Sequence, residues 1–117
     1  MGLSNRPGYV RGRHYKTYVE NVQNLKRQSK FEDAEKLLLE LICATETESK
    51  AEKSGVAPWY YEELAKLYRK QKDYQKEVEI LKRFAKQKHA RGVKPKQLLD
   101  RLEKAKILLK STLVSNS

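Results

Sequence analysis

Apolar side chains recur at steps of three and four residues along most of the chain, which is the pattern of amphipathic α-helices packed on a common core. Short polar pairs such as Ser29-Lys30 and Lys72-Asp73 lie between these stretches and are typical of tight turns. The pattern predicts five helices, over residues 14–28, 31–48, 58–71, 74–89 and 95–109.

The phrase Gly-Val-x-Pro occurs twice, beginning at Gly55 and at Gly92, and the two copies are 37 residues apart. In each copy Gly follows a predicted helix or polar stretch, and Pro stands where the first turn of the next helix is expected. A period in the thirties is typical of stacked helical hairpins, which bury their apolar faces against their neighbours. We therefore expect each copy to mark the start of a repeat.

The two ends of the chain lack this pattern. Residues 1–13 hold three Gly, one Pro and three Arg, which predicts a flexible basic arm. Residues 111–117 are polar and predict a disordered tail. One helical-repeat domain remains, residues 14–110, which is long enough for one core. Within it, residues 45–54 are polar, and two interpretations stay open: the end of a long second helix, or a loop.

The third and fourth predicted helices carry the residues of a known repeat. Tyr61 is a large residue early in the first helix, Leu64 and Ala65 form a large-small pair, and Tyr68 is the next aromatic. Leu81 follows in the second helix. This order resembles the tetratricopeptide repeat, a helix pair of about 34 residues. The resemblance implies an all-α fold of stacked antiparallel helical hairpins, right-handed, with about five helices in two and a half repeats.

Other parts of the chain match this repeat less closely. Glu77 stands where the family has a small residue, which implies either looser packing or a paired carboxylate at that position. The fifth helix matches only as the first helix of a pair and would therefore cap the stack. The matching positions are Tyr18, Val22, Leu25, Phe31, Ala34 and Leu38 in the first pair, and Leu98, Leu102 and Ala105 in the fifth helix.

The net charge of +11 is distributed unevenly along the chain. Residues 1–30 carry seven basic and one acidic side chain, residues 31–54 carry three basic and seven acidic, and residues 55–117 carry sixteen basic and seven acidic. A basic protein with one acidic band suggests an acidic or polyanionic partner. The alternative is that the charge serves solubility alone.

The resemblance also implies where a partner would bind. In proteins built from such repeats, partners lie in a concave groove that the first helix of each pair lines. The positions expected to face it carry mainly basic and aromatic side chains, which suit an acidic protein or peptide. A simple solvated face is the competing interpretation. The predicted partner-binding residues are Lys16, Lys26, Arg27, Trp59, Lys66, Arg69 and Lys70.

Nucleic acid is the alternative ligand. Basic side chains alternate with tyrosines in the N-terminal arm and the first helix, and such an arm can bind phosphates and unpaired bases. No known nucleic-acid-binding motif is present, and Tyr15 and Tyr18 also suit the core. The residues predicted for this alternative are Arg6, Arg11, Arg13 and Lys16.

The sequence gives no pattern typical of an enzyme. His14 and His89 lie far apart without metal-ligand spacing, and no glycine-rich phosphate loop is present. We therefore expect no catalytic residue, no metal and no cofactor. Cys43 is the only cysteine, which suits a reducing compartment, and its apolar neighbours predict that it is buried. Without a membrane-spanning run or a signal peptide, the sequence predicts a cytoplasmic protein.

The fifth predicted helix has apolar residues on more than one side, including Leu98, Leu99, Leu102, Ile107 and Leu109. One stripe caps the core, and the remainder suggests a homodimer through this C-terminal helix. Together these features predict a small adaptor that recognises an acidic partner without turnover. A regulator or inhibitor of another protein belongs to the same class, and the sequence does not separate the two.

Overall fold

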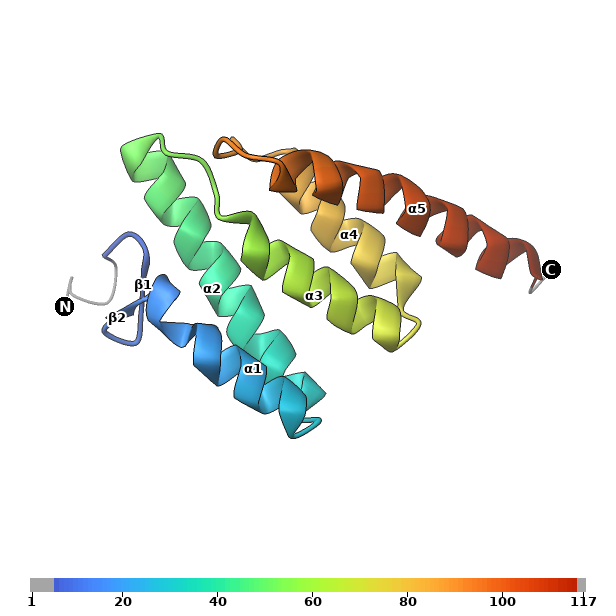
Figure 1. Cartoon of the computed structure of the whole chain (residues 1–117), viewed down its shortest axis with the longest axis horizontal. Helices are drawn as coiled ribbons and strands as arrows, with labels where there is room; N and C mark the ends of the chain where they lie inside the picture. The colour runs from blue at the N-terminus through green and yellow to red at the C-terminus, as the bar shows by residue number, and fades with distance from the viewer. Residues whose placement is uncertain (1–5, 116–117) are drawn as a thin grey trace.

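Five α-helices follow one another in the described part of the chain, residues 6–115 of a computed structural model, and each packs on the next (Figure 1). The all-α fold class with five helices is therefore confirmed. A short hairpin and a 3₁₀ helix precede α1. The elements are β1 (Tyr9–Val10), β2 (Arg13–His14), η2 (Tyr15–Tyr18), α1 (Val19–Arg27), α2 (Phe31–Glu52), α3 (Pro58–Lys70), α4 (Tyr74–Ala85) and α5 (Lys94–Ser115).

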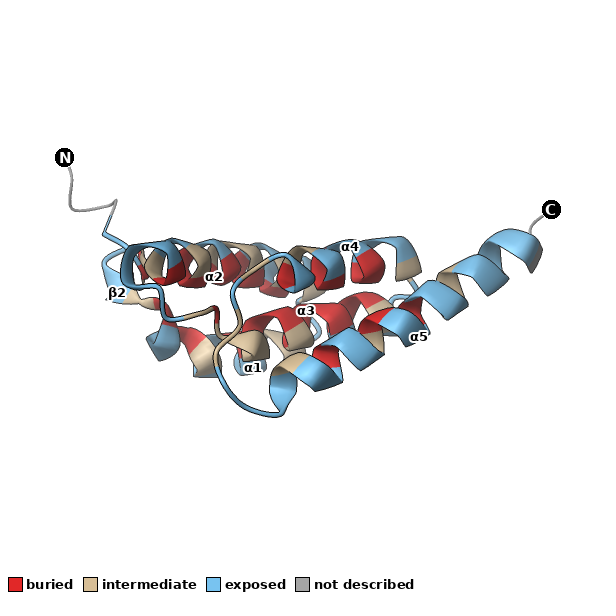
Figure 2. Ribbon diagram, turned by 90° about the horizontal axis from the view of Figure 1, so that it is seen from above, coloured by how far each residue is buried: buried red, intermediate tan, exposed pale blue. Residues whose placement is uncertain are grey.

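The helices form two layers, with α2 and α4 in one layer and α1, α3 and α5 in the other (Figure 2). The faces that the layers turn toward each other carry the buried residues (Figure 2). Burying a large aliphatic or aromatic side chain contributes about 1.5–3 kcal/mol, so this shared core is the main stabilising feature. The largest fully buried apolar side chains include Tyr61, Phe84, Leu38, Leu41, Ile42, Leu64 and Leu81.

The polar stretch 45–54 continues α2 as far as Glu52. Two buried hydroxyl groups explain why this stretch is helical and not a loop. Thr45 Oγ1 accepts a hydrogen bond from the backbone N–H of Ala57 at 3.0 Å, and Ser49 Oγ accepts one from the N–H of Gly55 at 3.1 Å. The end of α2 thus satisfies the backbone of the loop that leads into α3.

Helix α4 ends at Ala85, four residues before the predicted end at His89. The following segment bonds elsewhere. The N–H of Val56 donates to the carbonyl of Lys88 at 2.8 Å, and Val56 and His89 form an isolated parallel bridge. The His89 ring stacks on Phe84 with centroids 4.2 Å apart. Residues 88–89 therefore leave the helix to cover the loop before α3.

The two Gly-Val-x-Pro phrases begin α3 and α5, as the period predicts, but their valines differ. Val56 is fully buried under residues 88–89, whereas Val93 is 72% exposed. Gly55 has a φ of +88° and lies so close to the His89–Ala90 backbone that an added Cβ would be 2.5 Å from the nitrogen of Ala90. The first phrase is therefore an internal junction between hairpins.

The flexible arm predicted over residues 1–13 is wrong for residues 6–13, while residues 1–5 lie outside the described residues. Strands β1 and β2 form an antiparallel hairpin with Val10 opposite Arg13. The two residues between the strands, Arg11 and Gly12, have φ values of +50° and +84°, as a type I′ turn requires. Val10 is buried, and its carbonyl accepts a hydrogen bond from the Tyr18 hydroxyl at 2.7 Å, which ties the hairpin to the core.

The disordered tail predicted over residues 111–117 is also different in the structure. Helix α5 continues to Ser115, and residues 116–117 lie outside the described residues. Polar residues such as Lys110 and Thr112 are good enough helix formers to extend a helix that has already begun. The Thr112 hydroxyl also donates to the carbonyl of Leu108 at 3.0 Å. The C-terminal half of α5 projects beyond the other helices (Figure 1).

Candidate functional site

A fully buried carboxylate, Glu77 on α4, joins three helices. Arg69 of α3 donates from Nε to Glu77 Oε1 at 3.0 Å, and Arg101 of α5 donates from Nε to Glu77 Oε2 at 3.1 Å. A terminal nitrogen of Arg69 lies 2.9 Å from Glu77 Oε2. Of the two interpretations of Glu77 at a small-residue position, the structure shows the paired carboxylate. Two arginines on one carboxylate leave a positive charge in excess.

These two arginines lie in a cleft of about 340 Å³ between α3 and α5. Both carboxylates in its lining already have a lysine partner: Glu62 is 2.9 Å from Lys94, and Asp100 is 3.5 Å from Lys96. Lys104 forms no ion pair within residues 6–115. The cleft therefore keeps an excess of positive charge. Its lining residues are Glu62, Arg69, Gln97, Asp100, Arg101 and Lys104.

Lys26 and Lys66 converge on one carboxylate beside this cleft. Lys26 of α1 lies 2.5 Å and Lys66 lies 3.5 Å from Glu63, a residue of α3 that is 8% exposed. The pair Lys26–Glu63 joins α1 to α3. Lys66 is about half exposed at its side chain and lies on the α3 face that also carries Glu62 and Arg69, because these positions are three or four residues apart.

The other predicted partner-binding residues do not join this cluster. The guanidinium of Arg27 donates to the side chain of Asn24 in its own helix. Lys70 directly follows Arg69, but its amine lies 5.1 Å from the centroid of the Phe31 ring of α2, and Lys70 does not line the α3–α5 cleft. Trp59 is half-buried and packs edge-on against Tyr60, and Lys16 is exposed on η2. The structure therefore places Arg69 in the cleft and Lys66 on the adjoining face.

The sequence prediction missed Arg101 and Lys104. One signal could have identified Arg101: it lies 37 residues after Leu64, so it is a charged residue at the position where the preceding repeat has a core leucine. Its neighbour Leu102 is buried, as is Ala105. A lone arginine within such an apolar stripe indicates a buried acidic partner, and that partner is Glu77.

The arginines predicted for nucleic acid binding lie on the hairpin and are engaged within the protein. Arg11 is 2.5 Å from Glu40 of α2. Arg13 lies over the Tyr18 ring at 4.2 Å and donates to the Thr17 carbonyl at 2.6 Å, and Arg6 lies over the Tyr9 ring at 4.0 Å.

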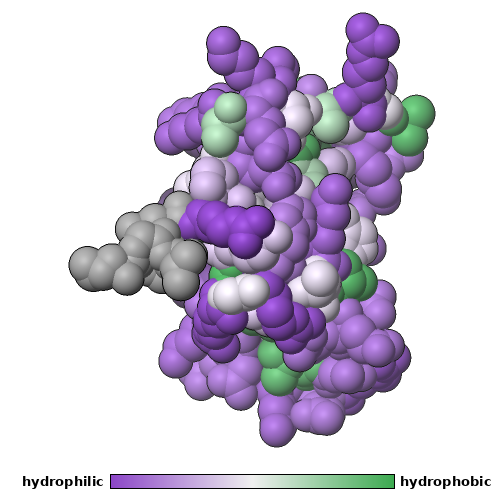
Figure 3. Space-filling model, turned by 90° about the vertical axis from the view of Figure 1, so that its left-hand side faces the viewer, coloured by the Kyte–Doolittle hydropathy of each residue, from purple (hydrophilic) through white to green (hydrophobic). Residues whose placement is uncertain are grey.

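The tyrosines of this region belong to the core. Tyr15 and Tyr18 are 3% and 6% exposed, as their positions in the helical pattern predict. Figure 3 shows the hairpin end of the molecule, whose visible surface is mostly hydrophilic with small, separated apolar areas. Among the described residues, this end therefore offers exposed cations but few exposed rings for stacking.

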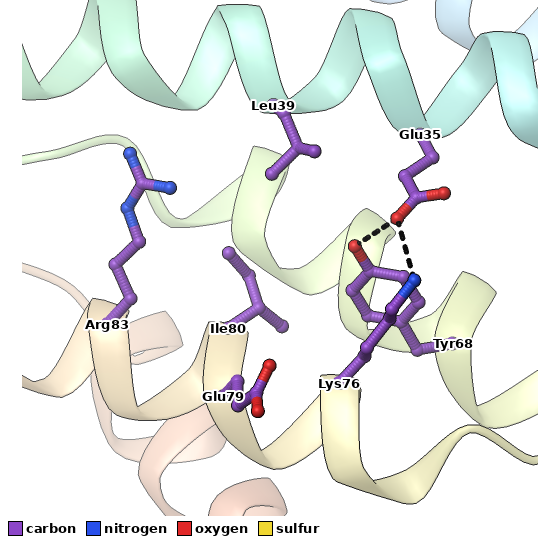
Figure 4. A pocket seen from close by; sticks show the side chains of 7 residues that line it. All are labelled: Glu35, Leu39, Tyr68, Lys76, Glu79, Ile80 and Arg83. Carbon is purple, nitrogen blue, oxygen red and sulfur yellow. Dashed lines mark hydrogen bonds and ion pairs between the residues drawn. The ribbon is translucent and has the colours of Figure 1, made fainter.

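A second cavity, of about 310 Å³, lies between α2 and α4 with α3 beneath it (Figure 4). Leu39 and Ile80 point toward each other across it (Figure 4). At one end Glu35 accepts a hydrogen bond from the Tyr68 hydroxyl at 2.7 Å and lies 3.7 Å from Lys76. We call this cavity the α2–α4 groove; its lining residues are Glu35, Leu39, Tyr68, Lys76, Glu79, Ile80 and Arg83.

Tyrosine hydroxyl groups hold α3 against α2. Tyr61 donates to Glu46 at 2.7 Å, and Glu46 also accepts two hydrogen bonds from Arg83 of α4 at 2.8 Å. Burial, and then the hydrogen bond to the carboxylate, raises the pKa of Tyr61 well above its usual value. Burial and the hydrogen bond to Glu35 raise the pKa of Tyr68 in the same way. Burial raises the pKa of Tyr60 to about 12.

These pKa shifts predict that the fold loses stability at alkaline pH. An unfolded tyrosine ionises near pH 10, whereas buried Tyr60 ionises near pH 12 and the Tyr61 and Tyr68 groups later. The stabilisation is therefore fully present below pH 10 and decreases as the pH rises above it. Circular dichroism and tyrosinate absorbance, followed together from pH 8 to 13, should show unfolding and late ionisation in one transition. Full ionisation of every tyrosine near pH 10 with intact helices would contradict this.

Cys43 is exposed, which corrects the prediction that it is buried. It lies on α2 between the buried residues Ile42 and Ala44, but successive helical positions are about 100° apart, so its side chain leaves the apolar face. Its sulfur lies 3.4 Å from a terminal nitrogen of Arg83. Within residues 6–115, no three His, Cys, Asp or Glu side chains are grouped as a metal site would need. None of the helices described there has the length and apolar character needed to cross a membrane.

A comparison with known proteins finds no protein family, no curated protein and no solved structure that matches the chain. The function is therefore inferred from the residues of the chain and their geometry. Of the sites above, the cleft between α3 and α5 combines the most concentrated positive charge with donors that are held in place.

Proposed function

We propose that this protein is a non-enzymatic interaction module that binds an acidic segment of another protein in the cleft between α3 and α5. The observation that supports this proposal most is the pair Arg69 and Arg101 on the single buried carboxylate of Glu77. An incoming carboxylate would neutralise the excess charge of this cluster. The exposed amines of Lys66 and Lys104 extend the positive surface to either side.

The fixed position of the arginines favours binding. Each guanidinium group is held by an ion pair with Glu77, which is fully buried on α4. Both groups are therefore ordered before a ligand arrives. Ordering a long side chain on binding costs about 0.5–1.5 kcal/mol, and that cost is reduced here. Within the described residues Arg101 uses its Nε for Glu77, which leaves its terminal N–H groups for a second carboxylate.

The finer features of the proposal follow from the repeat pattern and the composition. We propose a right-handed, tetratricopeptide-like stack in which α1, α3 and α5 form the binding face and α5 caps the stack. A cytoplasmic location suits the single cysteine, which is exposed and would be kept as a thiol there. Both an adaptor and an inhibitor that masks an acidic surface would use this cleft in the same way.

Binding of nucleic acid through Arg6, Arg11, Arg13 and Lys16 is the competing proposal. Arg11 and Arg13 would have to exchange contacts with Glu40 and Thr17 for phosphates. Such exchange is costly where the arginine contact is already charge-assisted. The acidic-peptide proposal needs less exchange: Lys66 would give up its contact with Glu63, whereas Lys104 forms no ion pair within residues 6–115.

Reversing two charges beside the cleft should weaken the binding of an acidic peptide. The probe is a fluorescently labelled decaglutamate peptide, titrated at about 0.1 M salt and followed by anisotropy. We expect the variant Lys66→Glu/Lys104→Glu to bind at least about tenfold more weakly, equivalent to about 1.4 kcal/mol. Both residues are exposed, so the fold should remain intact.

The matched control is Lys82→Glu/Lys86→Glu, at one position on α4 and one at its C-terminal cap, which changes the net charge equally at two exposed positions that do not line the cleft. We expect a loss of less than about twofold in this variant, because long-range attraction is screened over about 10 Å. Equal losses in the two variants would mean that only net charge matters. Tighter binding of a single-stranded oligonucleotide, abolished by Arg6→Glu/Arg13→Glu, would favour the competing proposal.

A further inference from the structure

Helix α5 is much longer than the helices on which it packs. It has 22 residues, against 13 in α3 and 12 in α4. Its first half is anchored by Leu98, Leu102 and Ala105, which are at most 6% exposed. Beyond them Ile107 and Leu113 are 65% and 62% exposed. Figures 1 and 2 show this second half projecting past the rest of the molecule.

The projecting half is basic as well as aliphatic. After Glu103 the sequence contains Lys104, Lys106 and Lys110 and no acidic residue. Lys106 forms an ion pair with Glu103 at 3.3 Å, and Lys110 forms none within the described residues. We call residues 106–114 the α5 extension. Two large aliphatic side chains, Ile107 and Leu113, are exposed on this basic segment, which is typical of a surface that binds a partner.

The α2–α4 groove has the complementary character. Its two sides are apolar at Leu39 of α2 and Ile80 of α4 (Figure 4). Both cations in its lining are already neutralised, since Lys76 pairs with Glu35 and Arg83 with Glu46. Glu79 is exposed and accepts a hydrogen bond only from the neutral amide of Gln75 among the described contacts. The charge that the groove offers to a ligand is therefore negative.

The dimensions of the two surfaces also agree. Lys76 and Arg83, at the two ends of the groove, are seven residues apart on α4, which corresponds to about 10 Å along a helix. Ile107 and Leu113 are six residues apart on α5, which corresponds to about 9 Å. Positions six apart on a helix point about 120° apart, so a helix laid in the groove could turn one of these side chains toward Leu39 of α2 and the other toward Ile80 of α4.

We propose that the α5 extension of one molecule binds in the α2–α4 groove of a second copy. Ile107 and Leu113 would cover Leu39 and Ile80, and the lysines of the extension would approach Glu79. This goes beyond the binding of an acidic partner, since it uses a different surface. It also differs from a symmetric pairing of two α5 helices, because here two unlike surfaces meet and each molecule offers both of them.

Since each molecule offers both surfaces, two copies could exchange extensions in a closed two-fold dimer, or successive copies could associate head to tail into rings or short chains. The surface that one helical segment can bury is smaller than that of stable dimers, so we expect weak association, with dissociation constants above about 10 μM.

Complementation between two variants tests the proposal. In the extension variant, Ile107→Lys/Leu113→Lys, the altered residues are exposed, and the groove is intact. In the groove variant, Leu39→Lys, the extension is intact, and the half-buried site lets the lysine reach solvent. If this variant is less stable than the native chain, Glu79→Lys serves as a second groove variant. Val93→Lys, which changes an exposed valine outside both surfaces, is the control.

Sedimentation velocity of the full chain over 5–500 μM gives the outcome. We expect the native chain and Val93→Lys to form dimers or larger species as concentration rises, and each of the two variants alone to stay monomeric. An equimolar mixture of the two variants should form a dimer and nothing larger. A groove variant that still dimerises alone would show symmetric α5 pairing and overturn the proposal, and so would a native chain that stays monomeric at 500 μM.

Discussion

Replacing Glu77 by glutamine should lower the free energy of unfolding by about 3 kcal/mol, which is the range for breaking a buried ion pair by removal of one partner. The change leaves Arg69 and Arg101 close together without the carboxylate that joins them. Both guanidinium groups are then partly buried like charges. Urea unfolding followed by circular dichroism measures the effect.

The matched control is Glu79→Gln, the same chemical change two residues away on α4 at an exposed position. We expect it to alter stability by less than about 0.5 kcal/mol. Equal effects of the two substitutions would mean that Glu77 contributes as an ordinary surface charge. In that case the two arginines are not held by a common carboxylate, and the physical basis of the proposed cleft is lost.

Replacing Gly55 by alanine should destabilise the fold by about 3 kcal/mol, from two causes. Its φ of +88° disfavours any residue with a Cβ by about 1–2 kcal/mol. The added methyl group would also lie 2.5 Å from the backbone nitrogen of Ala90 and 2.7 Å from the carbonyl carbon of His89. Since both neighbours are backbone atoms, the junction between the two hairpins must shift to relieve the contact.

Gly12→Ala separates the two causes. Gly12 has nearly the same φ, +84°, but an added Cβ would meet no atom within 4 Å. We expect this variant to lose only about 1 kcal/mol, the conformational part alone. Thermal unfolding of the two variants, compared with the native chain, measures the difference. If Gly55→Ala is no worse than Gly12→Ala, the close approach of residues 88–90 to Gly55 is not a feature of the folded protein.

The helical pattern predicted the fold because each helix carries its own apolar periodicity. Leu64, Ala65 and Tyr68 bury together as their spacing indicates, and Pro58 begins α3 as the repeated phrase indicates. What the pattern could not predict depends on contacts distant in sequence. Ser49 is polar, and its side chain is buried because it accepts a hydrogen bond from the Gly55 backbone, six residues along the chain.

The chain ends were mispredicted for the same reason. The hairpin forms because Arg11 and Gly12 accept positive φ values and Val10 finds a place in the core, and neither fact is visible as periodicity. In α5 Lys110 and Thr112 are exposed, so their polarity is compatible with a helix that projects into solvent. Composition alone cannot distinguish such a helix from a tail without structure.

For the candidate site, the sequence identified Arg69 but not its context. Arg69 and Arg101 are 32 positions apart, and only the stacking of α3, α4 and α5 brings them to the same carboxylate. Lys26, in contrast, was predicted to face a ligand and instead joins α1 to Glu63. A basic side chain on a helix face can neutralise a carboxylate of its own protein, and the sequence does not say which lysines do so.

The central claim is that the cleft between α3 and α5 recognises an acidic peptide. Its most direct test is a chemical-shift titration of the ¹⁵N-labelled protein with decaglutamate, and separately with a single-stranded oligonucleotide of equal charge. We predict that decaglutamate shifts the backbone amide signals of Arg69, Arg101 and Lys104 and the guanidinium signals of the two arginines. The amide signals of the hairpin should stay in place. Shifts confined to residues 6–16, or an oligonucleotide that binds more tightly than the peptide, would contradict the claim.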